Sequence, residues 1–177
     1  MNDSSEHVAP FDRAALLAKL DEWGMETRTI EHPPVATVEE SSRTHRDLPG
    51  AHTKNLFVKD KKGRVFVVVV PAHARVNLKA LHPTIGAQGR VSFGRPDQLW
   101  TLLGVRPGSV TVFGAINDRD GDVSVVLDQE IADAEIVCGH PLENTATTAI
   151  GQSDLRRFLE RCDHPPLVVA VPREADG

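Results

Sequence analysis

The sequence lacks the features that mark membrane, secreted or single-strand-coating proteins. Aromatic residues make up only 5% of its 177 residues and tyrosine is absent, so a ladder of base-stacking side chains is not expected. The longest apolar run, Val65–Val70, is far too short to span a bilayer. The first ten residues are too polar to form a signal peptide. We therefore expect a cytoplasmic protein with no membrane partner.

Cysteine is also scarce, which limits the metal and redox chemistry that the chain could carry. The two cysteines, Cys138 and Cys162, belong to no C-x-x-C or paired Cys/His spacing, so a zinc ribbon or finger is not predicted. Two isolated thiols are typical of a reducing cytosol. The eight histidines are scattered, and none stands four residues from another with a carboxylate partner.

Several familiar catalytic and binding motifs are missing as well. The chain has no P-loop, no G-x-G-x-x-G, no H-E-x-x-H and no G-x-S-x-G. Its 20 Lys and Arg against 25 Asp and Glu give a net charge of −5, which excludes a generic basic nucleic-acid coat protein. No helix-turn-helix with a basic recognition helix is evident, so sequence-specific DNA binding is not expected. A nucleic acid held at one short end stays compatible with this charge.

What is present predicts one α/β domain on a mixed sheet with helices packed outside it. Its expected bounds are 11–172, with a flexible arm over 1–10 and a tail over 173–177. The run 64–70 lacks polar alternation, so both faces of that strand should be covered. Helices are expected over 11–23, 38–43, 77–81, 97–103 and 153–161, and strands over 25–31, 55–59, 64–70, 110–116, 123–127, 135–138 and 167–171. Thr37 and Ser153 are the expected N-caps of the second and last helices, and Gly104 the expected end of the fourth.

Three segments stand out as candidates for chemistry. In residues 52–58, Lys54 enters a predicted core strand, either as a strand-end charge reaching solvent or as a fixed ammonium for a phosphate or carboxylate. Residues 104–111 form a tight bend, either a plain turn or a loop whose exposed N–H groups hold an oxyanion or a carbonyl. Cys138 and His140 would face the same side of an extended segment, which permits a thiolate–imidazole pair; the alternative is a buried cysteine and a turn histidine. A β segment is favoured for the threonine-rich stretch that follows.

Taken in order, a set of short motifs resembles the prolyl-tRNA editing superfamily (YbaK/ProX-like), and within it the free-standing alanyl-tRNA(Pro) deacylases. The motifs are HPPVATVEE (32–40), TKNLF (53–57), PGSVT (107–111), GHPL (139–142) and NTATT (144–148). The combination is specific, and the likeness extends from about Phe11 to Val171. One departure is visible: relatives commonly carry a proline four residues after the bend glycine, where this chain has Val112.

The resemblance implies a strongly curved mixed sheet and hydrolysis of the ester that joins alanine to the terminal adenosine of tRNA(Pro). It implies no metal or organic cofactor. The implied partner is the aminoacylated acceptor end of tRNA(Pro), with prolyl-tRNA synthetase as a second candidate. By this likeness Lys54 holds the terminal phosphate backbone, the Gly108–Ser109 bend orients the ester and water, and His140 lies beside the aminoacyl group. The implied substrate-binding residues are Thr37, near the adenosine, and Asn55, Pro107, Val112 and Asn144.

Other functions stay open at this point. The chain could be a non-catalytic module that binds a nucleic-acid end, or a deacylase for cysteine or serine rather than alanine. Covalent catalysis by Cys138 is a third alternative.

Overall fold

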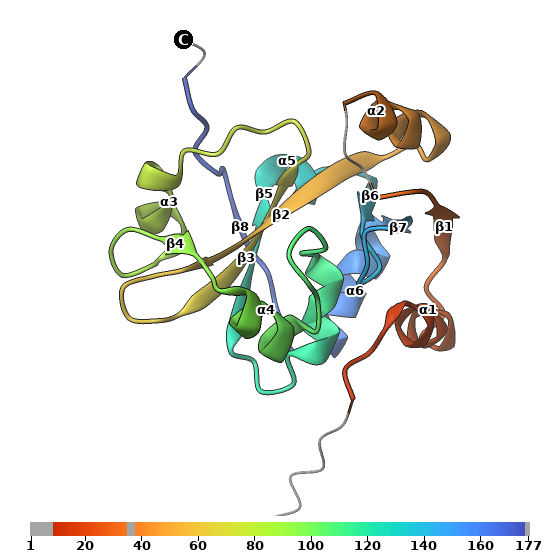
Figure 1. Cartoon of the computed structure of the whole chain (residues 1–177), viewed down its shortest axis with the longest axis horizontal. Helices are drawn as coiled ribbons and strands as arrows, with labels where there is room; N and C mark the ends of the chain where they lie inside the picture. Colours follow the sequence, from red (N-terminus) through yellow and green to blue (C-terminus); the bar gives the residue numbers. More distant parts are fainter. Residues whose placement is uncertain (1–8, 35–37, 176–177) are drawn as a thin grey trace, which may run out of the picture.

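Eight strands form one mixed sheet, with helices packed outside it, in the computed structural model, which describes residues 9–34 and 38–175 (Figure 1). The predicted fold class is therefore confirmed. The helices are α1 (Arg13–Glu22), α2 (Val38–Asp47), α3 (Leu78–Ile85), α4 (Pro96–Leu103), η1 (Val112–Asn117, 3-10), α5 (Gln129–Ala132) and α6 (Gln152–Arg161). The strands are β1 (Thr27–Glu31), β2 (Ala51–Lys59), β3 (Val65–Pro71), β4 (Ser92–Phe93), β5 (Val123–Asp128), β6 (Ile136–Gly139), β7 (Ala146–Gly151) and β8 (Leu167–Val169).

The order of the strands places β2 at the middle of the sheet. The order is β1-β7-β6-β2-β3-β5-β8, and the short β4 also pairs with β2. The predicted hairpin is confirmed as β2 and β3, which are antiparallel. β2 runs parallel to β6, which brings a segment more than 80 residues further along the chain beside it. This parallel pairing joins the TKNLF segment to the GHPL segment.

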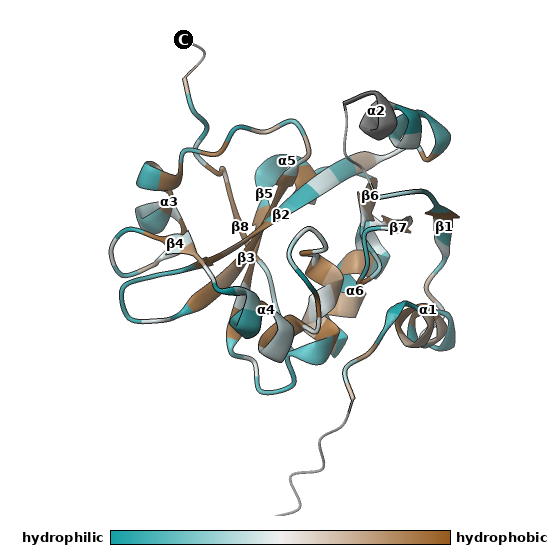
Figure 2. Ribbon diagram, in the orientation of Figure 1, coloured by the Kyte–Doolittle hydropathy of each residue, from teal (hydrophilic) through white to brown (hydrophobic). Residues whose placement is uncertain are grey.

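Apolar side chains cover both faces of the central strands. Every residue of β3 is buried, as its unbroken valine run predicts. One face packs against α1, α4, η1 and α6 through residues such as Leu16, Leu103 and Phe158. The other face packs against α3 through Leu81 and Ile85. Figure 2 shows the hydrophobic strands at the centre and hydrophilic stretches outside. Among the described residues, no helix has both the length and the apolar character needed to cross a membrane.

The predicted strand over 110–116 is wrong, because residues 112–117 form the 3-10 helix η1. Thr111 ends the extended backbone there, since its Oγ1 accepts a hydrogen bond from the N–H of Phe113 at 3.2 Å. The residues that follow are buried, and η1 packs against α4. A short apolar run cannot by itself distinguish a buried strand from a buried helix.

Other boundaries also differ from those predicted. Gly151, not Ser153, precedes α6 as its N-cap and provides no side-chain hydrogen bond. Instead, the Gln152 side chain donates to the carbonyls of Ile131 and Ala134, so tertiary contacts fix this helix start. Thr37, the other predicted N-cap, lies outside the described residues. β2 begins at residue 51, so Lys54 lies inside the strand. The predicted end of α4 at Gly104 is confirmed, and this glycine has a left-handed φ of 65°.

Candidate active site

The segments predicted to carry the site meet along β2. β6 pairs with the start of this strand at 51–52, and β4 pairs with its end at 58–59. A small cavity lies at the β6 contact, and a second hollow lies where residues 107–110 approach residues 55–57 of β2. The two hollows are therefore neighbours along one strand.

The small cavity has a volume of about 110 Å³, and histidines and threonines are prominent in its wall. An enclosed cavity that holds a benzene ring has a volume of roughly 150 Å³, so this cavity is the smaller of the two. His140 is one of its wall residues. The wall is formed by Thr44, His45, His52, Thr53, Ala72, Cys138, Gly139, His140 and Thr147.

The hydrogen bond of His140 fixes which ring nitrogen carries the proton. Its Nδ1 lies 3.0 Å from the carbonyl oxygen of Ala146. A carbonyl can only accept, so Nδ1 donates and Nε2 is left as an acceptor in the neutral ring. Burial, the largest effect, lowers the pKa of His140, although the bond to Ala146 opposes it. The ring is therefore neutral at pH 7, and its Nε2 can accept a proton or a hydrogen bond.

His52 has the same character on the neighbouring strand. Its Nε2 donates to the carbonyl oxygen of Leu48 at 2.6 Å, and its ring stacks on His45 with centroids 4.0 Å apart. Burial lowers the pKa of His52, and the charge of His45 lowers it further when that ring is protonated. The cavity thus has neutral imidazoles on two sides. Sequence reasoning missed His52 as a wall residue, because strand alternation places it only on the face of Lys54, which is not part of the wall.

The bend over residues 107–111 is bound directly to the segment that carries His140. The hydroxyl of Thr111 donates to the carbonyl oxygen of His140 at 2.6 Å. Gly108 has a φ of +88°, which favours glycine, and a Cβ there would lie 3.7 Å from Nδ2 of Asn144. Ser109 is buried, and its N–H donates to the carbonyl oxygen of Arg106. The structure therefore brings Gly108, Ser109, His140 and Asn144 together.

Asn55 and Pro107 lie on the second hollow, which has a volume of about 260 Å³. Apart from these two residues its wall is mostly apolar and includes Phe93 and Leu99. Oδ1 of Asn55 is buried and has no hydrogen-bond partner among residues 9–34 and 38–175. A buried acceptor without a donor is costly, so it is suited to a ligand N–H or O–H.

Lys54 lies beside the small cavity without being part of its wall. Alternation along β2 places it on the same face as His52, which pairs with Cys138. Its side chain is half-buried and forms no ion pair or hydrogen bond with any residue that the structure describes. Asn55 faces the opposite side of the strand. Val112 lies in neither wall: it is buried at the start of η1, directly after the bend.

Cys138 is placed poorly for nucleophilic attack. The residue is 1% exposed, and its Sγ lies 3.9 Å from the carbonyl oxygen of Pro49. Burial raises the pKa of this thiol to about 11. The reactive form of cysteine is the thiolate, so the group is almost entirely in its unreactive form at neutral pH. The geometry favours the reading of Cys138 as a buried wall residue.

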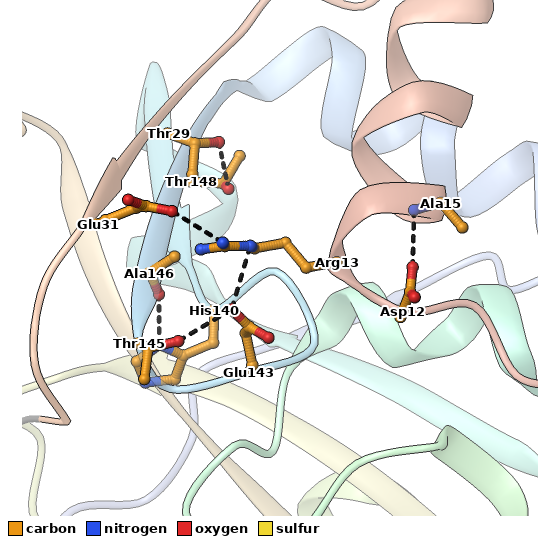
Figure 3. Close-up of polar contacts among 10 residues, drawn as sticks. All are labelled: Asp12, Arg13, Ala15, Thr29, Glu31, His140, Glu143, Thr145, Ala146 and Thr148. Atoms are coloured by element: carbon orange, nitrogen blue, oxygen red, sulfur yellow. Dashed lines mark hydrogen bonds and ion pairs between the residues drawn. The ribbon is translucent and has the colours of Figure 1, made fainter.

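An arginine on α1 fixes the loop that follows His140 (Figure 3). Nη2 of Arg13 lies 2.8 Å from Oε1 of Glu31 on β1, and its Nε lies 3.1 Å from Oε1 of Glu143. The same Glu143 oxygen accepts a hydrogen bond from Thr145 at 2.9 Å. These contacts join α1, β1 and the loop over residues 141–145. No signal in the sequence identified Arg13.

The part of the chain that the structure describes contains no group of three or more His, Cys, Asp or Glu side chains arranged to hold a metal ion. The fold and the two hollows define an α/β domain with a small, histidine-lined pocket beside a larger, more apolar one.

Comparison with known proteins gives this domain its family. A family model described as an aminoacyl-tRNA editing domain matches residues 32–158. The chain therefore belongs to the aminoacyl-tRNA editing family and is an aminoacyl-tRNA deacylase, a hydrolase.

The matches to its relatives span most of this chain and most of each relative. The prolyl-tRNA editing protein ProX of Acetoanaerobium sticklandii is 35% identical over 149 residues, which are 84% of this chain and 90% of that protein. The prolyl-tRNA synthetase associated domain-containing protein 1 of Danio rerio is 40% identical over 167 residues, which are 92% and 90% of the two chains. A solved structure of a candidate trans-editing enzyme for prolyl tRNA synthetase has a TM-score of 0.69 at 18% identity and covers 92% of this chain and 98% of that one. At that identity the likeness concerns the fold.

Proposed function

We propose that the protein is a trans-acting deacylase that hydrolyses the ester between alanine and the 3′-terminal adenosine of tRNA(Pro). The names of its relatives, which refer to prolyl-tRNA editing and to prolyl-tRNA synthetase, support tRNA(Pro) as the substrate. The observation that carries the choice of alanine is the cavity of about 110 Å³ beside His140. Alanine ends in a single methyl group, whereas the ring of proline approaches the size that needs roughly 150 Å³.

The physics of amino-acid selection explains why such an enzyme is needed. A synthetase pocket shaped for proline cannot strongly reject the smaller alanine, because the missing methylenes are worth only about 1–3 kcal/mol. A second, smaller pocket rejects proline by steric overlap and accepts alanine. The small volume of the cavity at His140, about 110 Å³, supports such a second selection.

In the proposed reaction, water attacks the carbonyl carbon of the ester and the bond from that carbon to the ribose 3′ oxygen breaks. The water proton passes to the departing 3′ oxygen, and the products are alanine and uncharged tRNA. Lys54 binds the phosphate backbone next to the terminal adenosine. Backbone N–H groups of the Gly108–Ser109 bend stabilise the developing oxyanion. The neutral Nε2 of His140 accepts a hydrogen bond from the aminoacyl group or from the water.

The vicinal 2′-hydroxyl of the ribose assists the attack, so no side-chain nucleophile is required. A substrate whose terminal adenosine lacks the 2′-hydroxyl should then be hydrolysed much more slowly than the normal one. Equal rates for the two substrates would remove this assisted route while leaving the deacylase itself intact.

The proposed substrate also indicates where in the cell the protein acts and which partner it has. Mischarged tRNA(Pro) arises at prolyl-tRNA synthetase, so we place the protein in the cytoplasm with that synthetase as a neighbour or partner. Substrate binding needs one well-placed cation at the terminal phosphate, which is compatible with a net charge of −5.

The test is incubation of a catalytic amount of the purified protein with Ala-tRNA(Pro). The proposal predicts loss of the ester well above its spontaneous rate, with many turnovers per protein molecule. A non-catalytic module would bind the tRNA end and leave the ester at its spontaneous rate.

A further inference from the structure

The charge of this chain is divided unevenly along its length. Residues 48–117 contain ten Lys or Arg and only two Asp or Glu, whereas the rest contains ten Lys or Arg and 23 Asp or Glu. A chain with a net charge of −5 therefore has a middle part with a net charge of +8. Such segregation creates a local positive field that the total charge conceals.

Both acidic residues of this middle part are already neutralised by neighbours. Asp60 is buried in the β2–β3 turn, where it accepts hydrogen bonds from the N–H of Gln88 and pairs with Arg64 at 3.2 Å. Asp97 is paired with Arg95 on the exposed start of α4. Among the described residues, the remaining cations of the turn and of the following loop form no ion pair with an acidic side chain.

These cations lie on one surface, because the turn and the loop over residues 86–95 are packed together. The N–H of Lys61 donates to the carbonyl oxygen of Gln88 at 3.1 Å, and the Lys61 stem fills the space beside Gly89. Lys59 pairs with Ser92 across β2 and β4. Lys61, Lys62 and Arg90 are exposed and form no ion pair within the described part of the chain. The turn is hydrophilic in Figure 2.

An exposed aromatic side chain borders the same surface. Phe93 lies on β4, which pairs with the end of β2, and is 59% exposed in a chain that has only eight Phe and Trp. Phe93 also lines the second hollow, together with Pro107 and Gly108 of the proposed site. Phe93 therefore connects the basic surface to the second hollow, on the Asn55 face of β2.

We propose that this surface, formed by the β2–β3 turn and the loop over residues 86–95, binds the phosphate backbone of the acceptor stem of the tRNA. The inference rests on the proposed function, which supplies the RNA end. β2 extends about 13 Å from Asn55 to Lys59 at roughly 3.3 Å per residue. An RNA whose unpaired end lies near Asn55 would therefore reach the basic turn with the nucleotides closer to its stem. Lysines contact the phosphates, and Phe93 offers a face on which an unpaired base can stack.

The test compares a long and a short substrate with a charge-reversed variant. The variant carries Lys61→Glu and Lys62→Glu, and the substrates are Ala-tRNA(Pro) and a CCA trinucleotide esterified with alanine. We expect kcat/KM to fall at least tenfold on Ala-tRNA(Pro) and less than twofold on the trinucleotide. The salt dependence of the rate on Ala-tRNA(Pro) should also weaken, because fewer counterions are released on binding. Arg28→Glu is the control: it changes charge in the same sense on the edge strand β1, which β7 and β6 separate from β2, and should affect neither substrate.

An unchanged rate on Ala-tRNA(Pro), or an equal loss on both substrates, would overturn the proposed surface. Failure of the proposed function is distinguished by the wild-type protein, which would then hydrolyse neither substrate. In that case the surface is judged by binding of uncharged tRNA(Pro) in fluorescence polarisation. A Kd that rises at least tenfold in the double variant supports the surface, and an unchanged Kd contradicts it.

Discussion

At the scale of single residues, Cys138 separates two mechanisms for the same site. Its thiol lines the small cavity, but burial raises its pKa to about 11. We therefore predict that Cys138→Ala keeps near-normal kcat/KM on Ala-tRNA(Pro), measured by ester loss under steady-state conditions. A loss of a thousandfold with an intact fold would instead establish covalent catalysis.

Lys54 should behave in the opposite way. A charge-assisted contact to a phosphate is worth about 1.5–3 kcal/mol, so Lys54→Ala should lower kcat/KM roughly 10- to 150-fold. Lys79→Ala, an exposed lysine on α3 outside both hollows, is the control, and its effect should be several-fold smaller. Unchanged catalytic efficiency in Lys54→Ala would refute the role given to this ammonium.

Single residues were also where sequence reasoning was most uneven. Gly108, Ser109, His140 and Asn144 were named from motifs, and the hydrogen bond from Thr111 to the carbonyl of His140 joins the bend to the segment that carries His140. His52 and Arg13 were missed, because neither a cavity wall nor a clamp between α1 and a distant loop leaves a local pattern in the sequence.

At the scale of elements, the ion pairs of Arg13 with Glu31 and Glu143 lead to a prediction about the loop over residues 141–145. Both of its ion pairs are partly exposed, so Arg13→Ala should change the free energy of unfolding by no more than about 1 kcal/mol. We nevertheless expect kcat/KM to fall three- to tenfold, because the loop after His140 loses its anchor to α1. The control is Arg157→Ala, which removes an exposed ion pair on α6 and should leave the activity unchanged.

An Arg13→Ala variant with full activity would contradict the role of Arg13 in holding this loop. A variant that fails to fold would contradict the small change expected in the free energy of unfolding. Arg13→Lys should recover part of the activity, since an ammonium can pair with one of the two carboxylates but not hold both in the planar geometry of a guanidinium.

The elements themselves were predictable where local pattern and burial agree. The valine run of β3 and the DKKG turn before it gave the hairpin directly. The prediction of a strand over 110–116 was wrong because an apolar run indicates burial but not conformation. The hydrogen bond of Thr111 and the packing against α4 favour the 3-10 helix at 112–117. The parallel pairing of β2 with β6, which creates the small cavity, joins distant segments and has no local signature.

At the scale of the whole molecule, a buried ion pair links stability to pH. Nε2 of His164 lies 2.7 Å from Oδ2 of Asp118, and both side chains are 2% exposed. The hydrogen bond to Asp118 raises the pKa of His164 above its ordinary 6.5, against the effect of burial. Burial would raise the pKa of Asp118, but the hydrogen bonds from His164 and from the N–H groups of Val123 and Asp122 outweigh it and lower the pKa below 3.8.

The two shifts predict a window of maximal stability. The contribution of His164 is complete below pH 6.5 and is lost as the pH rises through its raised pKa, while that of Asp118 is complete above pH 3.8 and is lost as the pH falls through its lowered pKa. The melting temperature of the wild type should therefore decline from pH 6 towards pH 9. Asp118→Asn should lose about 3–5 kcal/mol of stability at pH 6, because it leaves a buried imidazole without its charge partner. Thermal unfolding followed by circular dichroism checks both, and an equal alkaline decline in wild type and variant would contradict the pair.

The most direct test of the whole account is a panel of tRNA(Pro) charged with alanine, serine, cysteine or proline and hydrolysed by the wild-type protein under identical conditions. The cavity beside His140 predicts rapid release of alanine and a rate for proline that does not exceed spontaneous hydrolysis. Serine or cysteine released faster than alanine would reassign the cargo. Proline released as fast as alanine would contradict selection by a small cavity, and with it the function assigned to this site.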